Sequence, residues 1–446
     1  MSFGAESSVL LSPQQAPDAP CNTAIRSMKH IDATFAAPEE VGIDPSRLER
    51  LTHVLRDLVR SGPLPNAAML VARKGKVSFV DFVGEARPGK VVDGSTIWRV
   101  YSMAKPITSV AMLMLIEEGR ALLTDPIHRF LGQRWHRENL QVRASDGSLE
   151  PCQHDITIRH LLTHTAGLYY GPVYDSASQP DYPDIDSETN LETFVDKLPQ
   201  FPLAFQPGSQ WKYSYATDVV GRVVEVLSGM DLETFFQERI FRPLRMVDTS
   251  FYVQTEKLSR FVDCWQQVRE GERKNVTAEQ MRRREFQPGV LLSGGGGLVS
   301  TLSDYHRFCM FLLNGGSLDG HRLLSRKAVE WMTMNHLPGN KDMVSLSTAG
   351  YTETAIPGVG FGLGVAVHTD PVASGQIYSQ GSFSWGGSAN TYFLCDPVED
   401  ISFVFMTQLV GLDRARHPIR TMLPQVLYSA VADGPLKCQV SCHSSL

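Results

Sequence analysis

The sequence lacks the features that mark exported, metal-stapled or membrane-spanning chains. Its seven cysteines are scattered over 446 residues, with no C-x-x-C pair and no Cys/His zinc pattern, and so predict unpaired thiols in a reducing compartment. The first 21 residues contain no Lys or Arg and no sustained apolar run, unlike a secretory signal. No stretch of 18 apolar residues occurs, which argues against a membrane span. We therefore expect a cytoplasmic protein that does not enter a membrane.

The chain also lacks an excess of positive charge. The chain has 42 Lys and Arg against 48 Asp and Glu, a net charge of −6, which argues against nucleic acid as a partner. Hydrophobic residues make up 42% of the chain, enough to bury a core without a metal or disulfide staple. No G-x-S-x-G is present, and the glycine run 294–297 is not followed by G-K-[ST]. We therefore expect neither an α/β-hydrolase elbow nor a phosphate loop, and no cofactor or metal.

The hydrophobic pattern predicts one α/β body interrupted by a mostly helical insert. A helix from residue 45, a hairpin over 67–80 and a helix over 108–118 are followed by short helical segments, and then by strands over 361–368, 391–396 and 401–407 and a last helix over 418–432. The expected organisation is a loose N-terminal arm (1–36), a discontinuous α/β domain (37–125 and 291–433), a helical insert (126–290) and a flexible tail (434–446).

Ser102-Met103-Ala104-Lys105 is the strongest candidate for chemistry. It opens a long apolar segment, and residues three apart share one face of a helix. A serine hydroxyl becomes a nucleophile when a neighbour takes its proton, and a lysine in a partly dry site can act as that base. The pattern alone is weak, because Ser209-Gln210-Trp211-Lys212 also matches it but follows Pro207-Gly208 in a predicted turn.

Two further motifs carry possible chemistry. In Tyr213-Ser214-Tyr215 a tyrosine beside an ammonium could shuttle a proton, although tyrosines are more often packed against a core. In Ser384-Trp385-Gly386-Gly387-Ser388 two glycines allow close approach to a ligand, and an exposed N–H could complete an oxyanion hole. The alternative for this second motif is a β-bulge with a packed tryptophan.

Together, in this chain order, the three motifs resemble those of serine hydrolases with the class C β-lactamase-like fold, which carry S-x-x-K, Y-x-N and K-T-G. The family VIII carboxylesterases are the most similar branch, because they keep Ser, Lys and Tyr but have a W-G-G-like third motif. The resemblance covers about residues 40 to 432. Other stretches typical of the family are 160–168 (HLLTHTAGL), 241–244 (FRPL), 295–298 (GGGL) and 362–364 (GLG).

The resemblance implies a β-lactamase/penicillin-binding-protein-like α/β sandwich, with an antiparallel sheet flanked by helices and a mostly helical subdomain. It also implies a serine esterase that works through an acyl-enzyme. Ser102 would be the nucleophile, Lys105 the base in acylation, and Tyr213 the group that relays protons to the leaving alcohol and activates water. The backbone N–H groups of Ser102 and Ser388 would form the oxyanion hole.

Two departures from the family pattern concern the substrate. Tyr215 stands where Y-x-N has its Asn, and Trp385 stands where K-T-G has its Lys. Both losses favour small neutral esters with short acyl chains over β-lactams, with Trp385 as a flat apolar wall. The substrate pocket is expected to include Trp385, Gly386, Gly387, Tyr169, Tyr170 and Tyr215, under the loop 169–188.

Other interpretations remain open. The same acyl-enzyme could pass its acyl group to an alcohol or amine of a metabolite, or the chain could be a non-catalytic scaffold of the same fold. His160 and His164 have the i, i+4 spacing of zinc ligands, but Leu161 stands in place of the glutamate of H-E-x-x-H. We therefore expect both histidines to make structural hydrogen bonds.

Overall fold

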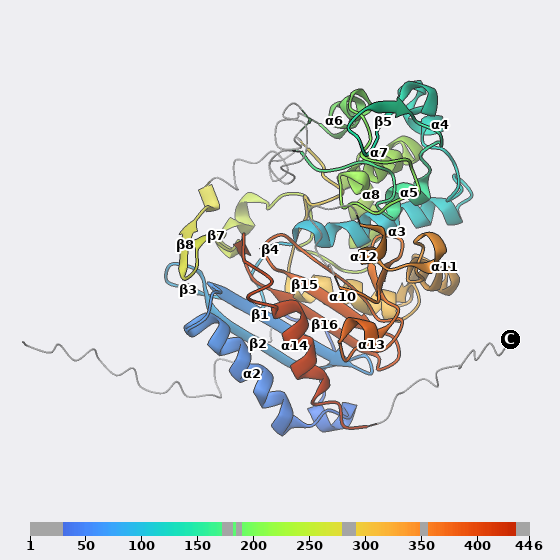
Figure 1. The fold of residues 1–446 in the computed structure, drawn as a ribbon. Helices are drawn as coiled ribbons and strands as arrows, with labels where there is room; N and C mark the ends of the chain where they lie inside the picture. The colour runs from blue at the N-terminus through green and yellow to red at the C-terminus, as the bar shows by residue number, and fades with distance from the viewer. Residues whose placement is uncertain (1–29, 172–181, 184–189, 279–290, 348–355, 434–446) are drawn as a thin grey trace, which may run out of the picture.

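An eight-stranded antiparallel sheet forms the centre of the molecule and is assembled from two distant parts of the chain (Figure 1). The structure is a computed structural model that describes residues 30–171, 182–183, 190–278, 291–347 and 356–433. The strand order is β12-β13-β14-β15-β16-β1-β2-β3. The strands span β1 (Asn66–Arg73), β2 (Lys76–Arg87), β3 (Lys90–Val91), β12 (Val359–Phe361), β13 (Ala366–His368), β14 (Phe383–Gly386), β15 (Tyr392–Asp396) and β16 (Ile401–Met406).

The central strand β1 explains why both faces of the sheet are covered. All eight of its residues are buried, and alternate side chains of a strand point to opposite faces. Ala68 and Leu70 belong to one hydrophobic core, whereas Met69 and Val71 belong to a second. A continuous apolar run is therefore the expected pattern for a strand that is buried on both sides.

Helices cover each face of the sheet. On one face α2 (Pro45–Arg60) and α14 (Ile419–Tyr428) pack side by side and share a core with β1, and on the other face α10 (Leu302–Leu313) packs against β16. Helix α2 begins where the sequence predicts: the Asp44 side chain accepts the N–H groups of Ser46 and Arg47, and Pro45 occupies the first turn. The result is a sandwich of helix, sheet and helix.

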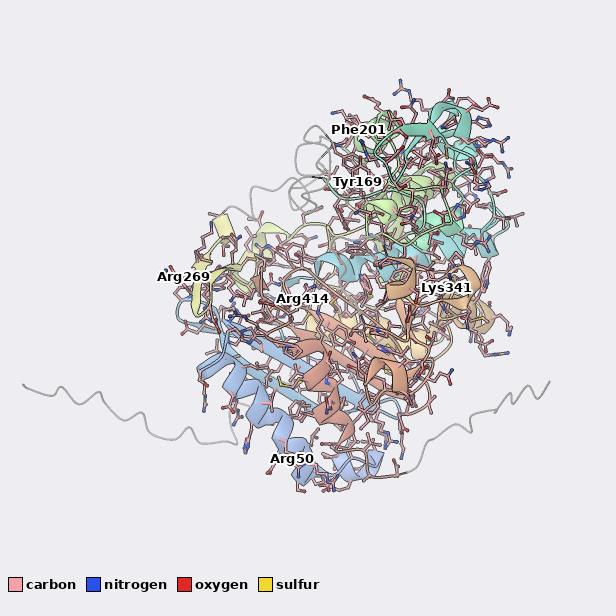
Figure 2. The ribbon with its side chains drawn as sticks, in the orientation of Figure 1. Arg50, Tyr169, Phe201, Arg269, Lys341 and Arg414 are labelled. Atoms are coloured by element: carbon pink, nitrogen blue, oxygen red, sulfur yellow. The ribbon has the colours of Figure 1, made fainter. Side chains whose placement is uncertain are left out.

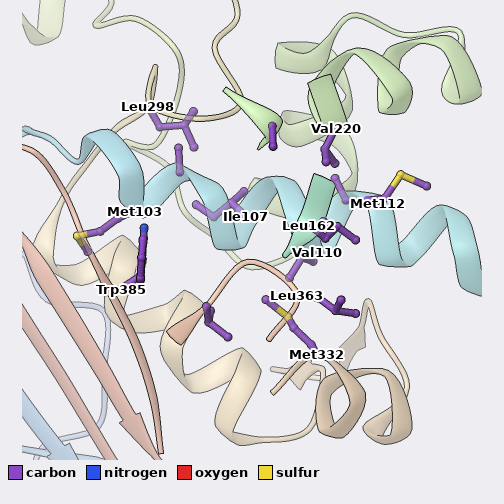
Figure 3. Close-up of a cluster of buried hydrophobic side chains, with 14 of the residues drawn as sticks. Met103, Ile107, Val110, Met112, Leu162, Val220, Leu298, Met332, Leu363 and Trp385 are labelled. Carbon is purple, nitrogen blue, oxygen red and sulfur yellow. The ribbon is translucent and has the colours of Figure 1, made fainter. Parts of the chain in front are cut away.

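Helix α3 (Ala104–Glu117) lies between the sheet body and the helical part of the molecule (Figure 1). Its residues from Ala104 to Leu115 are all buried, as expected of a helix that is apolar on every side. Figure 3 shows Met103, Ile107, Val110 and Met112 inside this core. The helical part is centred on α7 (Ala216–Ser228), which packs against α3. Helix α7 also contacts the four other helices of this part: α4 (His128–Leu131), α5 (Ile158–Leu162), α6 (Leu191–Lys197) and α8 (Leu232–Phe236).

Short elements join these layers. The remaining α-helices of the described residues are α11 (Arg326–Met332), α12 (Met343–Leu346) and α13 (Pro371–Ser374). In the same described ranges, four small sheets pair β4 (Trp98–Arg99) with β9 (Val299–Ser300), β5 (Gln141–Arg143) with β6 (Leu149–Pro151), β10 (Ser317–Leu318) with β11 (His321–Arg322), and β7 (Trp265–Arg269) with both β8 (Glu272–Asn275) and β17 (Leu409–Val410).

The structure differs from the sequence prediction in three places. Residues 30–36 are not a loose arm, because Phe35 bridges Val77 and Ile31 is buried. The single strand predicted over 361–368 is the hairpin β12–β13, whose turn contains Gly364 in a left-handed conformation (φ 91°). The insert also contains the strands β5 to β8, which the helical periodicity did not reveal.

The predicted tail 434–446 and residues 1–29 of the predicted arm lie outside the described residues. Within the described part of the chain, we find no helix that is long and apolar enough to cross a membrane.

Candidate active site

Ser102 lies on a strained turn at the start of α3. The turn begins after β4, where the Val100 N–H donates to the Leu298 carbonyl oxygen (3.1 Å). Tyr101 has a φ of 44°, which is a left-handed backbone conformation. Residues other than glycine adopt it at an energetic cost, and such strained residues are concentrated at functional sites. Ser102 follows in the short 3-10 helix η2 (Tyr101–Met103), and Lys105 is the second residue of α3.

The expected Ser–Lys pair is present. Lys105 is completely buried, and its Nζ donates to Ser102 Oγ at 3.2 Å. The ammonium also donates to the Gly295 carbonyl oxygen at 2.7 Å and to the Tyr170 hydroxyl at 3.0 Å. A buried ammonium needs such acceptors, because without them its transfer out of water is very costly. Three acceptors therefore hold Lys105 with its nitrogen beside the serine.

Tyr213 is the third predicted residue, and it lies against the same ammonium. Lys105 Nζ is 4.6 Å from the centre of the Tyr213 ring, and Tyr213 itself is 4% exposed. Its hydroxyl oxygen accepts a hydrogen bond from Trp385 Nε1 at 3.2 Å. A donor aimed at a phenol oxygen favours the ionised form of that phenol. Trp385 thus has a polar contact with Tyr213 in addition to the apolar wall that the sequence predicts.

Glycine at position 387 brings β14 close to the serine turn. A Cβ atom built on Gly387 would lie 2.3 Å from the Val100 carbonyl oxygen, so this approach needs glycine. The Gly387 N–H donates to the Thr391 carbonyl oxygen (2.9 Å), and the Gly387 carbonyl accepts from Arg420. The next residue, Ser388, is half-buried, and its N–H donates to no residue that the structure describes.

Asp218 is a buried residue of the site that sequence reasoning missed. Its Oδ1 accepts the Ser293 hydroxyl at 2.6 Å and the Gly295 N–H at 3.0 Å. Burial raises the pKa of Asp218, and the nearby Lys105 ammonium opposes that rise. This carboxyl group holds the turn whose Gly295 carbonyl accepts from Lys105. Its only sequence signal is an acidic residue at the start of a predicted helix, which many surface helices share.

The two histidines set aside in the sequence both have hydrogen-bond partners. His160 Nδ1 accepts the Thr157 N–H at 3.2 Å, and His164 Nδ1 lies 3.2 Å from Ser214 Oγ. The His164 ring packs 4.8 Å from the Tyr213 ring. Burial, reinforced by the Lys105 charge, holds the pKa of His164 well below its usual range, so the imidazole beside Tyr213 is neutral.

The tyrosines predicted to line the pocket divide into two groups. Tyr170 contacts Tyr213 and Tyr215 edge-on, with ring centres 5.4 and 4.5 Å apart. Tyr169 instead stacks on Tyr182 at 4.0 Å, and Figure 2 places it in the helical part of the molecule. Tyr170 was predicted as a pocket residue, but its hydroxyl also binds Lys105. Most of the predicted covering loop 169–188, namely 172–181 and 184–188, lies outside the described residues.

The second S-x-x-K match does not form a comparable pair. Ser209 is exposed, and its hydroxyl donates to the Gln206 carbonyl oxygen at 2.7 Å. The Lys212 backbone N–H donates to the His164 carbonyl. Position at the head of a buried helix therefore separates the two matches, as the sequence pattern suggests.

The fold is that of β-lactamases and penicillin-binding proteins, which combine an antiparallel sheet with a helical subdomain. The site agrees with this class, because a Ser–Lys pair faces a tyrosine and a glycine-rich strand. The model of the Beta-lactamase family matches residues 51–424, and the chain belongs to that family.

Relatives with descriptive names agree with this assignment. Esterase EstB of Burkholderia gladioli is 31% identical over 418 residues, which cover 88% of this chain and 98% of EstB. The solved structure of EstCE1, described as a hydrolase with promiscuous acyltransferase activity, is 25% identical, has a TM-score of 0.69, and is matched over 87% of this chain and 99% of its own. Unliganded LovD, the simvastatin synthase of Aspergillus terreus, shares the fold at 23% identity and a TM-score of 0.72, over 87% and 99% of the two chains.

Proposed function

We propose that this protein is a serine esterase that hydrolyses small neutral carboxylic esters through an acyl-enzyme on Ser102. The observation that carries the proposal is the buried Lys105 ammonium, which donates to Ser102 Oγ at 3.2 Å and lies 4.6 Å from the ring centre of Tyr213. Lysines are rarely fully buried, so a buried lysine beside a serine and a tyrosine points to a functional site. The esterase and hydrolase names of EstB and EstCE1 support the same reaction class.

In acylation, Lys105 acts in its neutral amine form: Ser102 Oγ attacks the carbonyl carbon of the ester while Lys105 Nζ takes the hydroxyl proton and becomes the ammonium. The oxyanion that forms is stabilised by the backbone N–H groups of Ser102 and Ser388. The bond to the alcohol oxygen then breaks, and Tyr213 passes a proton to this leaving group.

In deacylation, Tyr213 takes a proton from water, and the resulting hydroxide attacks the acyl carbon. The Trp385 N–H, 3.2 Å from the Tyr213 oxygen, stabilises the phenolate that this step needs. Ser102 leaves as the acid product forms, and it recovers its proton through Lys105.

The substrate preference follows from two side chains. Trp385 stands where a cation would bind a substrate carboxylate, and it is buried and in edge contact with Tyr213. Tyr215, in place of the Asn of Y-x-N, packs against Tyr170. Neither supplies a charge or an amide for a β-lactam, so we expect neutral esters with short acyl chains.

The experiment compares Ser102→Ala with the wild type on p-nitrophenyl acetate and butyrate. We expect kcat to fall by at least ~10³-fold, because the covalent route is lost. Ser209→Ala is the matched control, since it alters the other S-x-x-K match and is expected to keep full activity. Unchanged turnover in Ser102→Ala would exclude the proposed esterase mechanism.

Acyl transfer is the second candidate, because EstCE1 combines hydrolysis with acyltransferase activity. An alcohol or amine in place of water would accept the acyl group from the same intermediate. Adding alcohols of increasing size to the ester assay separates the two outcomes: ester products indicate transfer, whereas only free acid indicates hydrolysis. A non-catalytic scaffold would not be labelled at Ser102 by a fluorophosphonate.

We also propose that the protein works in a reducing compartment such as the cytoplasm. The support is four buried free thiols: Cys152, Cys264, Cys309 and Cys395. Burial and the neighbouring Cys309 thiol both raise the pKa of Cys395, so these two thiols are neighbours without being bonded. Cell fractionation tests this expectation directly.

A further inference from the structure

Three possible metal ligands meet in the helical part of the molecule, on segments that contain none of the proposed catalytic residues. They are His128 on α4, His136 between two short 3-10 helices, and Asp155 in the loop before α5. Each can offer one ligand atom, and these atoms all lie within 4.8 Å of one another. The sequence gives no zinc pattern here, because the spacing 128–136–155 matches no standard motif.

The backbone around each of these residues is fixed by the core. Ile127, Trp135 and Ile156, the immediate neighbours of the three residues, are at most 1% exposed. The Ile127 N–H donates to the Ile156 carbonyl at 2.9 Å, which ties the α4 segment to the Asp155 loop. The His136 N–H donates to the Gln133 carbonyl at 3.0 Å. The three side chains are therefore held near one another before any ion arrives.

One buried polar atom of the cluster has no partner in the described part of the chain, whereas two others accept backbone N–H groups: Asp155 Oδ1 accepts that of Arg137 at 3.2 Å, and His136 Nδ1 accepts that of Glu138 at 3.5 Å. His128 Nδ1 is buried and has no hydrogen-bond partner among the described residues, and it lies 3.6 Å from Asp155 Oδ1. The His128 and His136 rings are 4.8 Å apart, edge to face. The Glu138 carboxylate is 3.7 Å from His136 Nδ1 on a side chain that is 76% exposed, so it is free to rotate toward an ion.

We propose that His128, His136 and Asp155 bind a divalent transition-metal ion, with Zn²⁺ as the best fit. Two imidazoles and one carboxylate suit borderline ions such as Zn²⁺ and are a poor set for Mg²⁺ or Ca²⁺, which take oxygen ligands. Ligand atoms in a tetrahedral zinc site lie roughly 3.3–3.5 Å apart. The 3.6 Å from His128 Nδ1 to Asp155 Oδ1 is close to that range, and the largest separation in the cluster, which is at most 4.8 Å, must shorten by up to about 1.3 Å. Water or the Glu138 carboxylate completes the shell.

The role of this ion is to stabilise the helical part, because it cross-links three segments of the chain. The alternative is a plain His–Asp ion pair, which predicts no saturable binding of Zn²⁺.

The test titrates Zn²⁺ into metal-stripped full-length protein by calorimetry at pH 7.5. The background carries serine at Cys21, Cys438 and Cys442, so that thiols outside the described residues do not bind the ion. We expect one saturable site. His136→Ala and the nearly isosteric Asp155→Asn are each expected to weaken Zn²⁺ binding by at least ten-fold, whereas His321→Ala, at an exposed histidine on β11, leaves it unchanged.

Two further measurements do not depend on activity. Saturating Zn²⁺ is expected to raise the thermal unfolding midpoint of the background protein but not of Asp155→Asn, and Mg²⁺ is expected to raise neither. Co²⁺ is expected to give visible absorption bands without the charge-transfer band of thiolate ligands. Absence of saturable binding, or equal Zn²⁺ affinity in the background and both site variants, would overturn the proposal. Ser102→Ala is expected to bind Zn²⁺ normally, which separates this proposal from the proposed esterase function.

Discussion

At the scale of single residues, the site depends on a buried lysine whose Nζ donates hydrogen bonds to protein groups in place of water. Lys105 Nζ has the Ser102 hydroxyl, the Tyr170 hydroxyl and the Gly295 carbonyl within 3.2 Å. The serine is thus only one of several acceptors, and the others fix the position of the nitrogen. Tyr213 completes the set through its ring and through the hydrogen bond from Trp385.

Replacing Trp385 with Phe tests that hydrogen bond. The variant keeps an aromatic ring but removes the N–H that donates to Tyr213, so we expect kcat for aryl esters to fall about ten-fold, the effect of ~1.4 kcal/mol. Trp211→Phe is the matched control: Trp211 stacks on Tyr213 with ring centres 6.2 Å apart, and its Nε1 has no partner among the described residues. Steady-state kinetics that show equal losses in both variants would contradict a specific role for Trp385.

At the scale of elements, the turn that contains Gly295 connects α7 to the lysine. Asp218 on α7 accepts the Gly295 N–H, and the Gly295 carbonyl accepts from Lys105. A Cβ atom at position 295 would lie 2.4 Å from Asp218 Oδ2, whereas one at Gly296 would meet nothing closer than 3.9 Å. There is therefore room for a methyl group at position 296 but not at position 295.

Gly295→Ala is expected to lower both stability and activity. The added methyl group pushes the turn away from Asp218, which costs about 1–3 kcal/mol of unfolding free energy and displaces an acceptor of Lys105. Gly296→Ala is expected to change the unfolding free energy by less than ~0.5 kcal/mol. Urea denaturation and ester hydrolysis measure the two effects. Equal behaviour of both variants would show that the turn does not position the lysine.

The sequence predicts local parts of the site and misses those that depend on the tertiary fold. The approach of Lys105 to Ser102 needs only a helical i, i+3 relation, so it follows from the sequence. Tyr170 and Gly295 reach Lys105 from 65 and 190 positions along the chain, and no local pattern encodes that. The strand predicted over 361–368 fails for a similar reason, because apolar character does not reveal the tight turn at Gly364.

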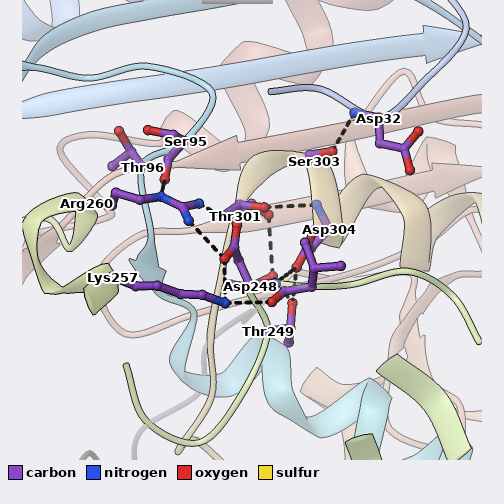
Figure 4. A network of polar contacts seen from close by, with 12 residues as sticks. Asp32, Ser95, Thr96, Asp248, Thr249, Lys257, Arg260, Thr301, Ser303 and Asp304 are labelled. Atoms are coloured by element: carbon purple, nitrogen blue, oxygen red, sulfur yellow. Dashed lines mark hydrogen bonds and ion pairs between the residues drawn. The ribbon is translucent and has the colours of Figure 1, made fainter. Parts of the chain in front are cut away.

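At the scale of the whole molecule, polar contacts join the insert to helix α10 of the sheet body. Figure 4 shows Asp248 bound by Lys257 and Arg260, next to the buried Asp304 at the start of α10. Asp304 Oδ2 accepts the Asp248 N–H at 2.7 Å and the Thr249 hydroxyl at 2.9 Å. Burial raises the pKa of Asp304 to about 7, so this carboxyl group changes charge near neutral pH.

This raised pKa predicts a pH dependence of folding. The folded state holds the Asp304 proton more tightly than the unfolded state, so its stabilisation is complete below pH ~3.8 and is lost as the pH rises through about 7. Between pH 5 and 8 the loss amounts to at most ~3 kcal/mol, because each pKa unit corresponds to ~1.4 kcal/mol.

Asp304→Asn removes that component, and we expect its urea-derived unfolding free energy to rise relative to wild type as the pH increases from 5 to 8. Asp319→Asn is the control. Hydrogen bonding to Arg307 holds the pKa of Asp319 below its usual value, so its contribution changes only at acidic pH. A difference between wild type and Asp304→Asn that stays constant from pH 5 to 8 would contradict the prediction.

The most direct test of the central claim is to trap the acyl-enzyme and locate it. The protein is mixed with p-nitrophenyl butyrate, quenched in acid within the first turnovers, digested and analysed by peptide mass spectrometry. We expect one butyryl group on the peptide that contains Ser102, its loss in Ser102→Ala, and its retention in Ser209→Ala. Butyrylation of another residue, or hydrolysis by Ser102→Ala at the wild-type rate, would contradict the assignment of Ser102 as the nucleophile.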